Sequence, residues 1–180
     1  MPLLVIVAIF ASLFALTAQA QTVPEALARR IKANPERFVD GAATLIFGFG
    51  GPDGLDAAGV ERFIALERAG ARASVLRRLL AADLDGDGAV AADEMQVAAG
   101  AASASQRGRM LGLLAGADAD GDGAASGAEI TDFAAAEALE AFDELRAQMA
   151  RSVLGFDGNA DGRVTLPEVR RAVDRLADAA

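Results

Sequence analysis

Hydrophobic residues recur at helical spacing along most of the chain after residue 20, in segments separated by short runs of glycine and aspartate. One segment, about 57–69, places Val60 and Ile64 on the same helical face. Another begins at Ser74, a typical helix N-cap, and ends where Asp83 opens an acidic run. The pattern predicts an all-α fold in which helices alternate with loops.

Two further helices are predicted nearer the N-terminus. Thr22 is expected to cap a helix that runs to about Lys32, and Asn34 to cap a second helix that ends at about Phe47. The glycine-rich segment 48–54 then interrupts the helical pattern, because several adjacent glycines disfavour a helix.

Acidic runs begin at Asp83, Asp118 and Asp157, so successive starts lie 35 and 39 residues apart. A near-constant spacing of this size indicates a repeated supersecondary unit. Counting back 35 residues from the first start leads to Gly48, where the glycine-rich segment begins. The sequence therefore predicts four helix–loop–helix units, the first with an altered loop and the others with acidic loops.

We expect neighbouring units to pair along the chain. The first pair is predicted over 21–100, with units at about 35–69 and 74–99, and the second over 101–180, with units at about 106–137 and 142–177. The small and polar residues from Gly100 to Ser105 would separate the two pairs. Between Asp132 and Leu154 there is no glycine or proline, so the sequence leaves open whether the helix joining units three and four is continuous.

The first twenty residues form a distinct segment. The stretch from Leu3 to Leu16 is almost wholly apolar, and Ala18 and Ala20 supply the small residues that signal peptidases require before a cut at Gln21. We therefore predict that residues 1–20 are a signal peptide. The alternative is a retained membrane anchor, for which the apolar run is short.

Composition restricts the chemistry that the chain can perform. It contains no His and no Cys, so it lacks an imidazole base, a thiolate nucleophile and the nitrogen and sulfur ligands of zinc sites. The oxygen donors that remain suit calcium or magnesium. With a net charge of −9, the chain should repel nucleic acid and anionic membrane surfaces. We predict that it is not an enzyme.

The three acidic runs share one arrangement of oxygen donors. Each twelve-residue loop has Asp or Asn at positions 1, 3 and 5, Gly at position 6, a main-chain carbonyl at position 7 and Glu at position 12, which is the pattern of a calcium-binding loop. The predicted metal ligands are Asp83, Asp85, Asp87, Ala89 and Glu94 in the first loop; Asp118, Asp120, Asp122, Ala124 and Glu129 in the second; and Asp157, Asn159, Asp161, Arg163 and Glu168 in the third.

On these motifs, residues 35–180 resemble the EF-hand superfamily in its four-hand, calmodulin-like layout. The resemblance implies up to three Ca²⁺ ions, with weak competition from Mg²⁺, and a short two-stranded β pairing between partner loops. Charge count suggests that the third loop binds most weakly, because it carries three carboxylates and the others four.

The first hand departs from the family pattern. Its loop has Asp53 and Asp56 as its acidic residues and Gly59 near the place of the closing glutamate, so no tight metal site is expected there. Leu55 is available to pair with Val90. A plain glycine-rich connection accounts for this segment as well as a decayed hand does.

Two functions remain open at this stage. The first is a calcium buffer or calcium-stabilised structural module; the alternative is a calcium sensor that exposes an apolar groove for a dedicated protein partner. Sensors tend to use methionine-rich grooves, whereas Met95, Met110 and Met149 are scattered along the chain. The signal peptide, together with an alanine- and arginine-rich composition, indicates a periplasmic or secreted protein that has no membrane partner once the signal is removed.

Overall fold

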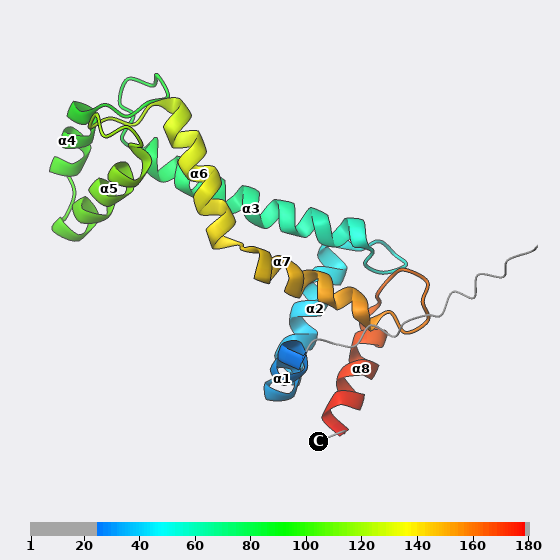
Figure 1. Cartoon of the computed structure of the whole chain (residues 1–180). Coiled ribbons are helices and arrows are strands. Elements are labelled where there is room, and N and C mark those ends of the chain that lie inside the picture. The colour runs from blue at the N-terminus through cyan, green and yellow to red at the C-terminus, as the bar shows by residue number, and fades with distance from the viewer. Residues whose placement is uncertain (1–24, 179–180) are drawn as a thin grey trace, which may run out of the picture.

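The computed structural model describes residues 25–178, and the fold is all-α (Figure 1). The helices are α1 (Glu25–Ala33), α2 (Pro35–Phe49), α3 (Ala57–Leu79), α4 (Ala92–Gly100), α5 (Ala104–Ala117), α6 (Gly127–Ala141), α7 (Glu144–Arg151), the short 3-10 helix η1 (Ser152–Phe156) and α8 (Leu166–Asp178). The predicted signal peptide and the Thr22 cap lie outside the described residues. Within 25–178, no helix has both the length and the apolar character needed to cross a membrane.

The predicted cap of α2 is confirmed. The Asn34 side chain accepts a hydrogen bond from the Arg37 N–H at 3.1 Å, and Pro35 occupies the first helical position. Main-chain N–H groups at the start of a helix lack helical acceptors. The Asn34 side chain supplies an acceptor for one of them, and proline has no N–H that needs one.

The predicted division of 57–79 into two helices is wrong, because α3 is continuous over 23 residues. Gly70 and Ser74 lie inside it, and one interior glycine costs a helix only about 1 kcal/mol. Val60 is buried near the start of α3 and Leu79 at its end. Packing of α3 along α6 and α7 offsets the weak local signal, and the helix runs from the end that carries α4 and α5 to the group of α1, α2 and α8.

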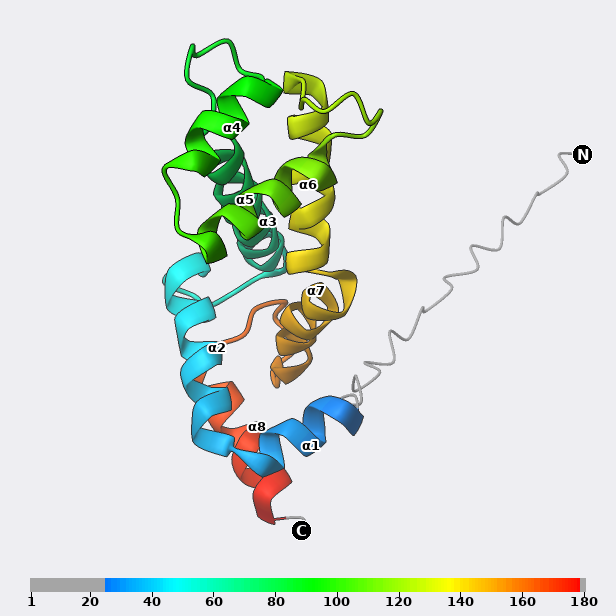
Figure 2. The ribbon, with the colours of Figure 1, turned by 90° about the vertical axis from the view of Figure 1, so that its left-hand side faces the viewer.

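Two separate hydrophobic cores lie at the two ends of α3. Helix α1 and units one and four build the first core, whose fully buried side chains include Ile31, Leu55, Val60, Val164 and Val169. Units two and three build the second core, from Val75, Leu79, Val90, Met95, Leu114 and Ile130 among others. Figures 1 and 2 show α4 and α5 at one end of the molecule and α1, α2 and α8 at the other.

The predicted pairing of neighbouring units is therefore wrong. Leu55 forms an isolated antiparallel bridge with Val164, not with Val90, and Val90 forms one with Ala125. Unit one thus pairs with unit four and unit two with unit three, and single bridges replace the expected two-stranded pairing in the described residues. The reason is geometric: a helix of 23 residues is about 34 Å long, so α3 holds the loops at its two ends far apart.

The sequence left open the connection between units three and four, and the structure contains a break there. Helix α6 ends at Ala141, Phe142 leaves the helical conformation, and Asp143 caps α7 by accepting from the Arg146 N–H at 2.9 Å. The Arg146 guanidinium donates to the Ala141 carbonyl. This bend lets α6 and α7 follow α3 as two straight pieces.

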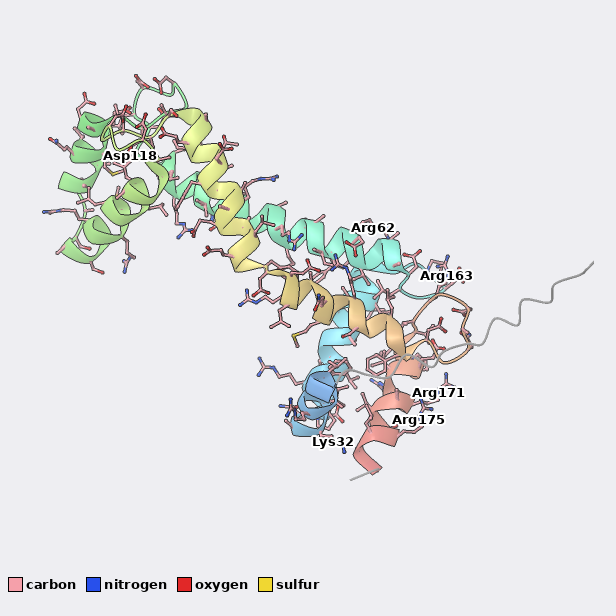
Figure 3. All side chains as sticks on the ribbon, viewed as in Figure 1. Lys32, Arg62, Asp118, Arg163, Arg171 and Arg175 are labelled. Atoms are coloured by element: carbon pink, nitrogen blue, oxygen red, sulfur yellow. The ribbon has the colours of Figure 1, made fainter. Side chains whose placement is uncertain are left out.

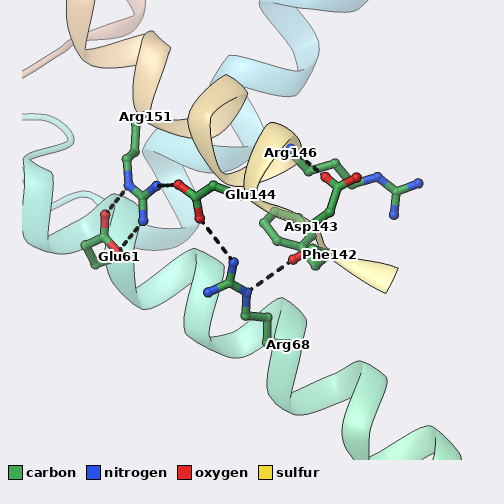
Figure 4. Close-up of polar contacts among 7 residues, drawn as sticks. All are labelled: Glu61, Arg68, Phe142, Asp143, Glu144, Arg146 and Arg151. Carbon is green, nitrogen blue, oxygen red and sulfur yellow. Dashed lines mark hydrogen bonds and ion pairs between the residues drawn. The ribbon is translucent and has the colours of Figure 1, made fainter. Parts of the chain in front are cut away.

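A cluster of charged residues fixes the bend against α3 (Figure 4). Arg68 of α3 donates to the Phe142 carbonyl at 3.1 Å and lies 3.6 Å from a Glu144 carboxylate oxygen. Arg151 of α7 pairs with Glu61 at 2.6 Å and with Glu144 at 2.7 Å. The cluster thus joins the N-terminal half of α3 to both ends of α7.

The Glu61–Arg151 pair predicts a specific dependence of stability on pH. The hydrogen bond from Arg151 lowers the pKa of Glu61 below its ordinary 4.5. A lowered folded-state pKa stabilises the folded chain above about pH 4.5, and that contribution is lost as the pH falls through the lowered value. The melting temperature of Glu61→Gln should be lower than that of wild type at pH 7. The difference between the two melting temperatures should become smaller as the pH falls below about 4.5. Glu67→Gln, a change of an exposed residue on the same helix, is the control. A melting-temperature difference for Glu61→Gln that stays the same at neutral and at acidic pH would contradict the pairing.

Candidate metal sites in three acidic loops

Each acidic loop lies between two helices, and its closing glutamate belongs to the first turn of the second helix. Residues 83–94 connect α3 to α4, residues 118–129 connect α5 to α6, and residues 157–168 connect η1 to α8. Glu94, Glu129 and Glu168 are each the third residue of their helix. A carboxylate in the first turn is stabilised by the helix dipole and can reach back over the loop.

The Glu94 carboxylate folds back into its loop. Its Oε1 accepts from the N–H groups of Leu84 at 2.7 Å and Asp85 at 3.1 Å, and its Oε2 accepts from the Ala91 N–H at 2.8 Å. The glutamate thereby joins the beginning of the loop to its end.

The other two glutamates occupy the same position. Glu129 accepts from the N–H groups of Ala119 at 2.9 Å and Ser126 at 2.8 Å. Glu168 accepts from the N–H groups of Gly158 at 3.1 Å and Thr165 at 2.9 Å. All three predicted closing ligands are therefore directed into their loops. A carboxylate has about four lone-pair sites, so these bonds leave capacity for a cation.

The first aspartate of each loop sets the turn. Asp83 accepts from the Gly86 N–H at 2.7 Å and from the Gly88 N–H at 3.0 Å. Asp118 and Asp157 accept likewise from Gly123 at 2.9 Å and Gly162 at 2.8 Å. The glycine at position 6 has a φ between 82° and 89° in all three loops, a conformation that residues with a side chain rarely adopt.

The side chains at loop positions 3 and 5 accept hydrogen bonds from main-chain N–H groups of their own turn. The side chains at position 5 accept from the N–H of position 7 at 2.8 Å in every loop: Asp87 from Ala89, Asp122 from Ala124 and Asp161 from Arg163. The third positions, Asp85, Asp120 and Asn159, accept from the N–H of position 5 at 3.1 Å. The same pattern of side-chain to main-chain bonds thus recurs in all three loops.

Two of the loops bring three carboxylates together. One oxygen from each of Asp83, Asp85 and Asp87 lies within 4.8 Å of the others, and the same holds for Asp118, Asp120 and Glu129. Such a grouping of hard oxygen donors fits a divalent cation of the calcium type. Figure 3 labels Asp118 at the end of the molecule that carries these two loops.

The third loop differs from the other two. It forms no comparable carboxylate group among the described residues, since Asn159 supplies an amide where they have a carboxylate, and its Nδ2 donates to Asp161 at 2.8 Å. Glu168, however, is only 5% exposed, whereas Glu94 and Glu129 are half-buried. The third loop has fewer charges and a more enclosed closing ligand. Arg163, which belongs to this third loop, marks its place at the opposite end of the molecule from Asp118 (Figure 3).

Hydrogen bonds to the closing glutamates keep them ionised. The Ser126 hydroxyl and N–H, followed by the Ala119 N–H, lower the pKa of Glu129 to about 2. The N–H groups of Ala91 and Leu84 lower the pKa of Glu94. Burial raises the pKa of Glu168, but bonds from Thr165 and Gly158 outweigh it and the net direction is down. All three therefore carry a full negative charge at neutral pH.

Two side chains at loop position 9 hold the closing glutamates, a role that the ligand pattern alone did not predict. The hydroxyls of Ser126 and Thr165 each donate to a glutamate Oε2 at 2.7 Å. A sequence signal for this role exists, because Ser or Thr three residues before Glu is the capping-box spacing. Ala91 has no hydroxyl, so the first loop lacks this bond.

The loops of units two and three lie against each other. Val90 and Ala125 exchange main-chain hydrogen bonds of 2.8 and 2.9 Å. Carboxylate-bearing residues of both loops, including Asp85, Glu94, Asp120 and Glu129, line a shared hollow of about 480 Å³. The carboxylates of the two loops are therefore close enough to interact electrostatically.

A comparison of the chain with protein-family models, with curated proteins and with solved structures gave no match.

Proposed function

We propose that the chain is a calcium-binding protein of four EF-hand units, three of which bind Ca²⁺, and that it acts as a calcium buffer or a calcium-stabilised structural module. The observation that carries the proposal is the position of Glu94, Glu129 and Glu168, each folded back over a turn of aspartate and asparagine oxygens. A bidentate glutamate at position 12 is what a calcium loop requires to complete its oxygen shell.

The donor set favours calcium over magnesium. Side-chain oxygens from positions 1, 3 and 5, a carbonyl at position 7 and two oxygens from the glutamate give the six or more ligands that calcium accepts in flexible geometry. Magnesium demands a near-ideal octahedron and retains water, so a loop that closes with a bidentate carboxylate suits it poorly. We expect Mg²⁺ to compete weakly.

Charge provides the energetic reason for calcium-dependent stability. The net charge is −9, and three calcium ions would reduce it to −3. Like charges crowded into one loop oppose each other's ionisation and push the loop apart. Binding to the folded state alone stabilises it by about 2.7 kcal/mol for each site at a free calcium concentration one hundred times Kd.

Thermal unfolding of the chain from residue 21, stripped with a chelator, tests this function. We expect millimolar Ca²⁺ to raise the melting temperature strongly and an equal concentration of Mg²⁺ to raise it much less. Equal shifts with the two cations would indicate general charge screening and would count against loop-specific binding.

A second candidate is the calcium sensor. It is supported by an apolar cavity of about 650 Å³ in the half of the molecule that holds units one and four. Its walls include Phe38, Phe49, Phe63 and Met149, from helices α2, α3 and α7. Calcium-dependent fluorescence of a dye that binds apolar surface separates the candidates: a sensor increases it on calcium addition, and a buffer leaves it unchanged. For either role we propose a periplasmic or secreted location.

A further inference from the structure

The apolar cavity of about 650 Å³ in the half that holds units one and four lies apart from the acidic loops. Most of its lining residues belong to α2 or to the cap of that helix, and we call it the α2 cavity. Among the described residues, none from 83–94, 118–129 or 157–168 lines it. Sites for small molecules typically have volumes of about 300–1,000 Å³. The α2 cavity is therefore large enough for a ligand of its own.

Three phenylalanines form apolar walls of the α2 cavity: Phe38, Phe49 and Phe63. The Phe49 and Phe63 rings meet edge to face, with their centroids 5.3 Å apart, and the Phe38 ring packs in the same way on Phe156 at 5.5 Å. These ring contacts hold the walls in place in the free protein. A ligand that enters therefore orders few side chains when it binds.

The polar end of the α2 cavity lies at the start of α2. Arg37 is the one charged residue among the described residues that line it, and its guanidinium forms no hydrogen bond or ion pair within the described part of the chain. Asn34 caps the helix through its Oδ1, which leaves two amide N–H donors. Thr44, in contrast, already donates to the Asp40 carbonyl at 3.0 Å. The free donors thus gather at one end of the cavity, where they suit an anion.

The apolar part of the cavity is long as well as wide. Arg37 and Phe49 both line it and are twelve residues apart on α2, so about 18 Å of helix axis separates them. That length accommodates an extended alkyl chain of about twelve to fourteen carbons. An apolar path of this length, with a single cation at one end, has the shape and charge of a site for a long-chain anion.

We infer that the α2 cavity binds a single-chain amphiphile with a carboxylate headgroup, with Arg37 and Asn34 donating to the carboxylate and the alkyl chain lying against the three phenylalanines. A guanidinium can donate two parallel hydrogen bonds to a carboxylate, and one guanidinium matches one negative charge. The inference goes beyond the sensor candidate, because the ligand is a small molecule and its binding needs no calcium. It can therefore hold or fail independently of the three calcium sites.

Calorimetric titration of the chain from residue 21 with sodium dodecanoate, below its micelle concentration, tests the headgroup site. The buffer contains a chelator, since calcium precipitates long-chain carboxylates. We expect Arg37→Gln to weaken binding by about tenfold or more, because the carboxylate loses a charge-assisted pair. Lys32→Gln is the matched control: it removes an equal charge from an exposed residue that does not line the cavity, and it should stay within about twofold of wild type.

Two glycines of α2 test where the alkyl chain lies. Gly41 and Gly48 both have open space where a Cβ would be, but only Gly41 lines the cavity. Leucine favours a helix more than glycine does, so both Gly41→Leu and Gly48→Leu should fold. Gly41→Leu places a side chain in the cavity and should weaken dodecanoate binding by about tenfold or more, whereas Gly48→Leu should stay within about twofold of wild type. Equal affinities for the two variants would overturn the inference.

The length of the ligand provides an independent readout. From octanoate to dodecanoate, each added CH₂ should tighten binding by about three- to fourfold, because it buries more apolar surface. An affinity that does not change with chain length would place the alkyl chain outside the cavity and contradict the inference. Equal losses for Arg37→Gln and Lys32→Gln, or no heat of binding from dodecanoate, would contradict it as well. Calcium titration of Gly41→Leu should still give three sites, whatever the outcome with dodecanoate.

Discussion

Glu94→Gln should reduce the number of calcium ions bound by the chain from three to two. The substitution removes one charge and the bidentate geometry, while the amide retains nearly the same volume. Changes to groups that merely support a metal ligand already cost about 10- to 100-fold in affinity, so loss of a direct ligand should weaken the first site by at least about 100-fold. Calorimetric titration measures both the number of sites and the affinity.

The neighbouring Asp93→Asn is the matched control. It removes an equal charge from an exposed residue of α4, and the amide oxygen can still accept from the Glu94 N–H, as the carboxylate does at 3.1 Å. We expect this variant to bind three ions. If both variants lost one site, net charge would be the cause; if neither did, Glu94 would not be a ligand.

Ile130→Ala should lower the free energy of unfolding by about 2–5 kcal/mol. Ile130 is 1% exposed, follows the closing glutamate of the second loop and packs in the second core. Truncation to alanine leaves a cavity that close-packed neighbours can fill only in part. Urea denaturation of the metal-free and the calcium-loaded chain gives the value in each state.

A control for this change lies on the same helix. Leu139 of α6 is 55% exposed, so Leu139→Ala should alter the free energy of unfolding by no more than about 0.5 kcal/mol. Comparable losses for the two variants would mean that the second core does not determine the stability of this half of the molecule.

The turns of the acidic loops are predictable from the sequence because their signals are local. Aspartates at alternating positions, a glycine at position 6 and a glutamate at position 12 act within twelve residues, and the structure directs Glu94, Glu129 and Glu168 into their loops. The Asn34 cap of α2 is predictable for the same reason, since its bond to Arg37 spans three residues.

The pairing of the units was not predictable from local signals. Gly70 and Ser74 favour a helix break, but their cost is small, and packing of α3 against α6 outweighs it. Position 8 of each acidic loop is apolar in every case, so it does not encode a partner. The continuous α3 separates the loops at its two ends, and Leu55 bridges to Val164 while Val90 bridges to Ala125.

This pairing changes how the sites relate to one another. Val90 and Ala125 join two acidic loops, whereas Leu55 joins the third acidic loop to a loop without a closing glutamate. The first two acidic loops therefore share a hollow lined by carboxylates, and the third acidic loop lies at the other end of α3. We expect the first two sites to influence each other and the third to bind independently.

Calorimetric titration of the chelator-treated chain with Ca²⁺ measures the central claim most directly. Three ions should bind for each chain, and the loaded protein should unfold at a higher temperature than the stripped one. A titration that gives no heat of binding, together with an unchanged melting temperature in millimolar calcium, would contradict the assignment of the three loops.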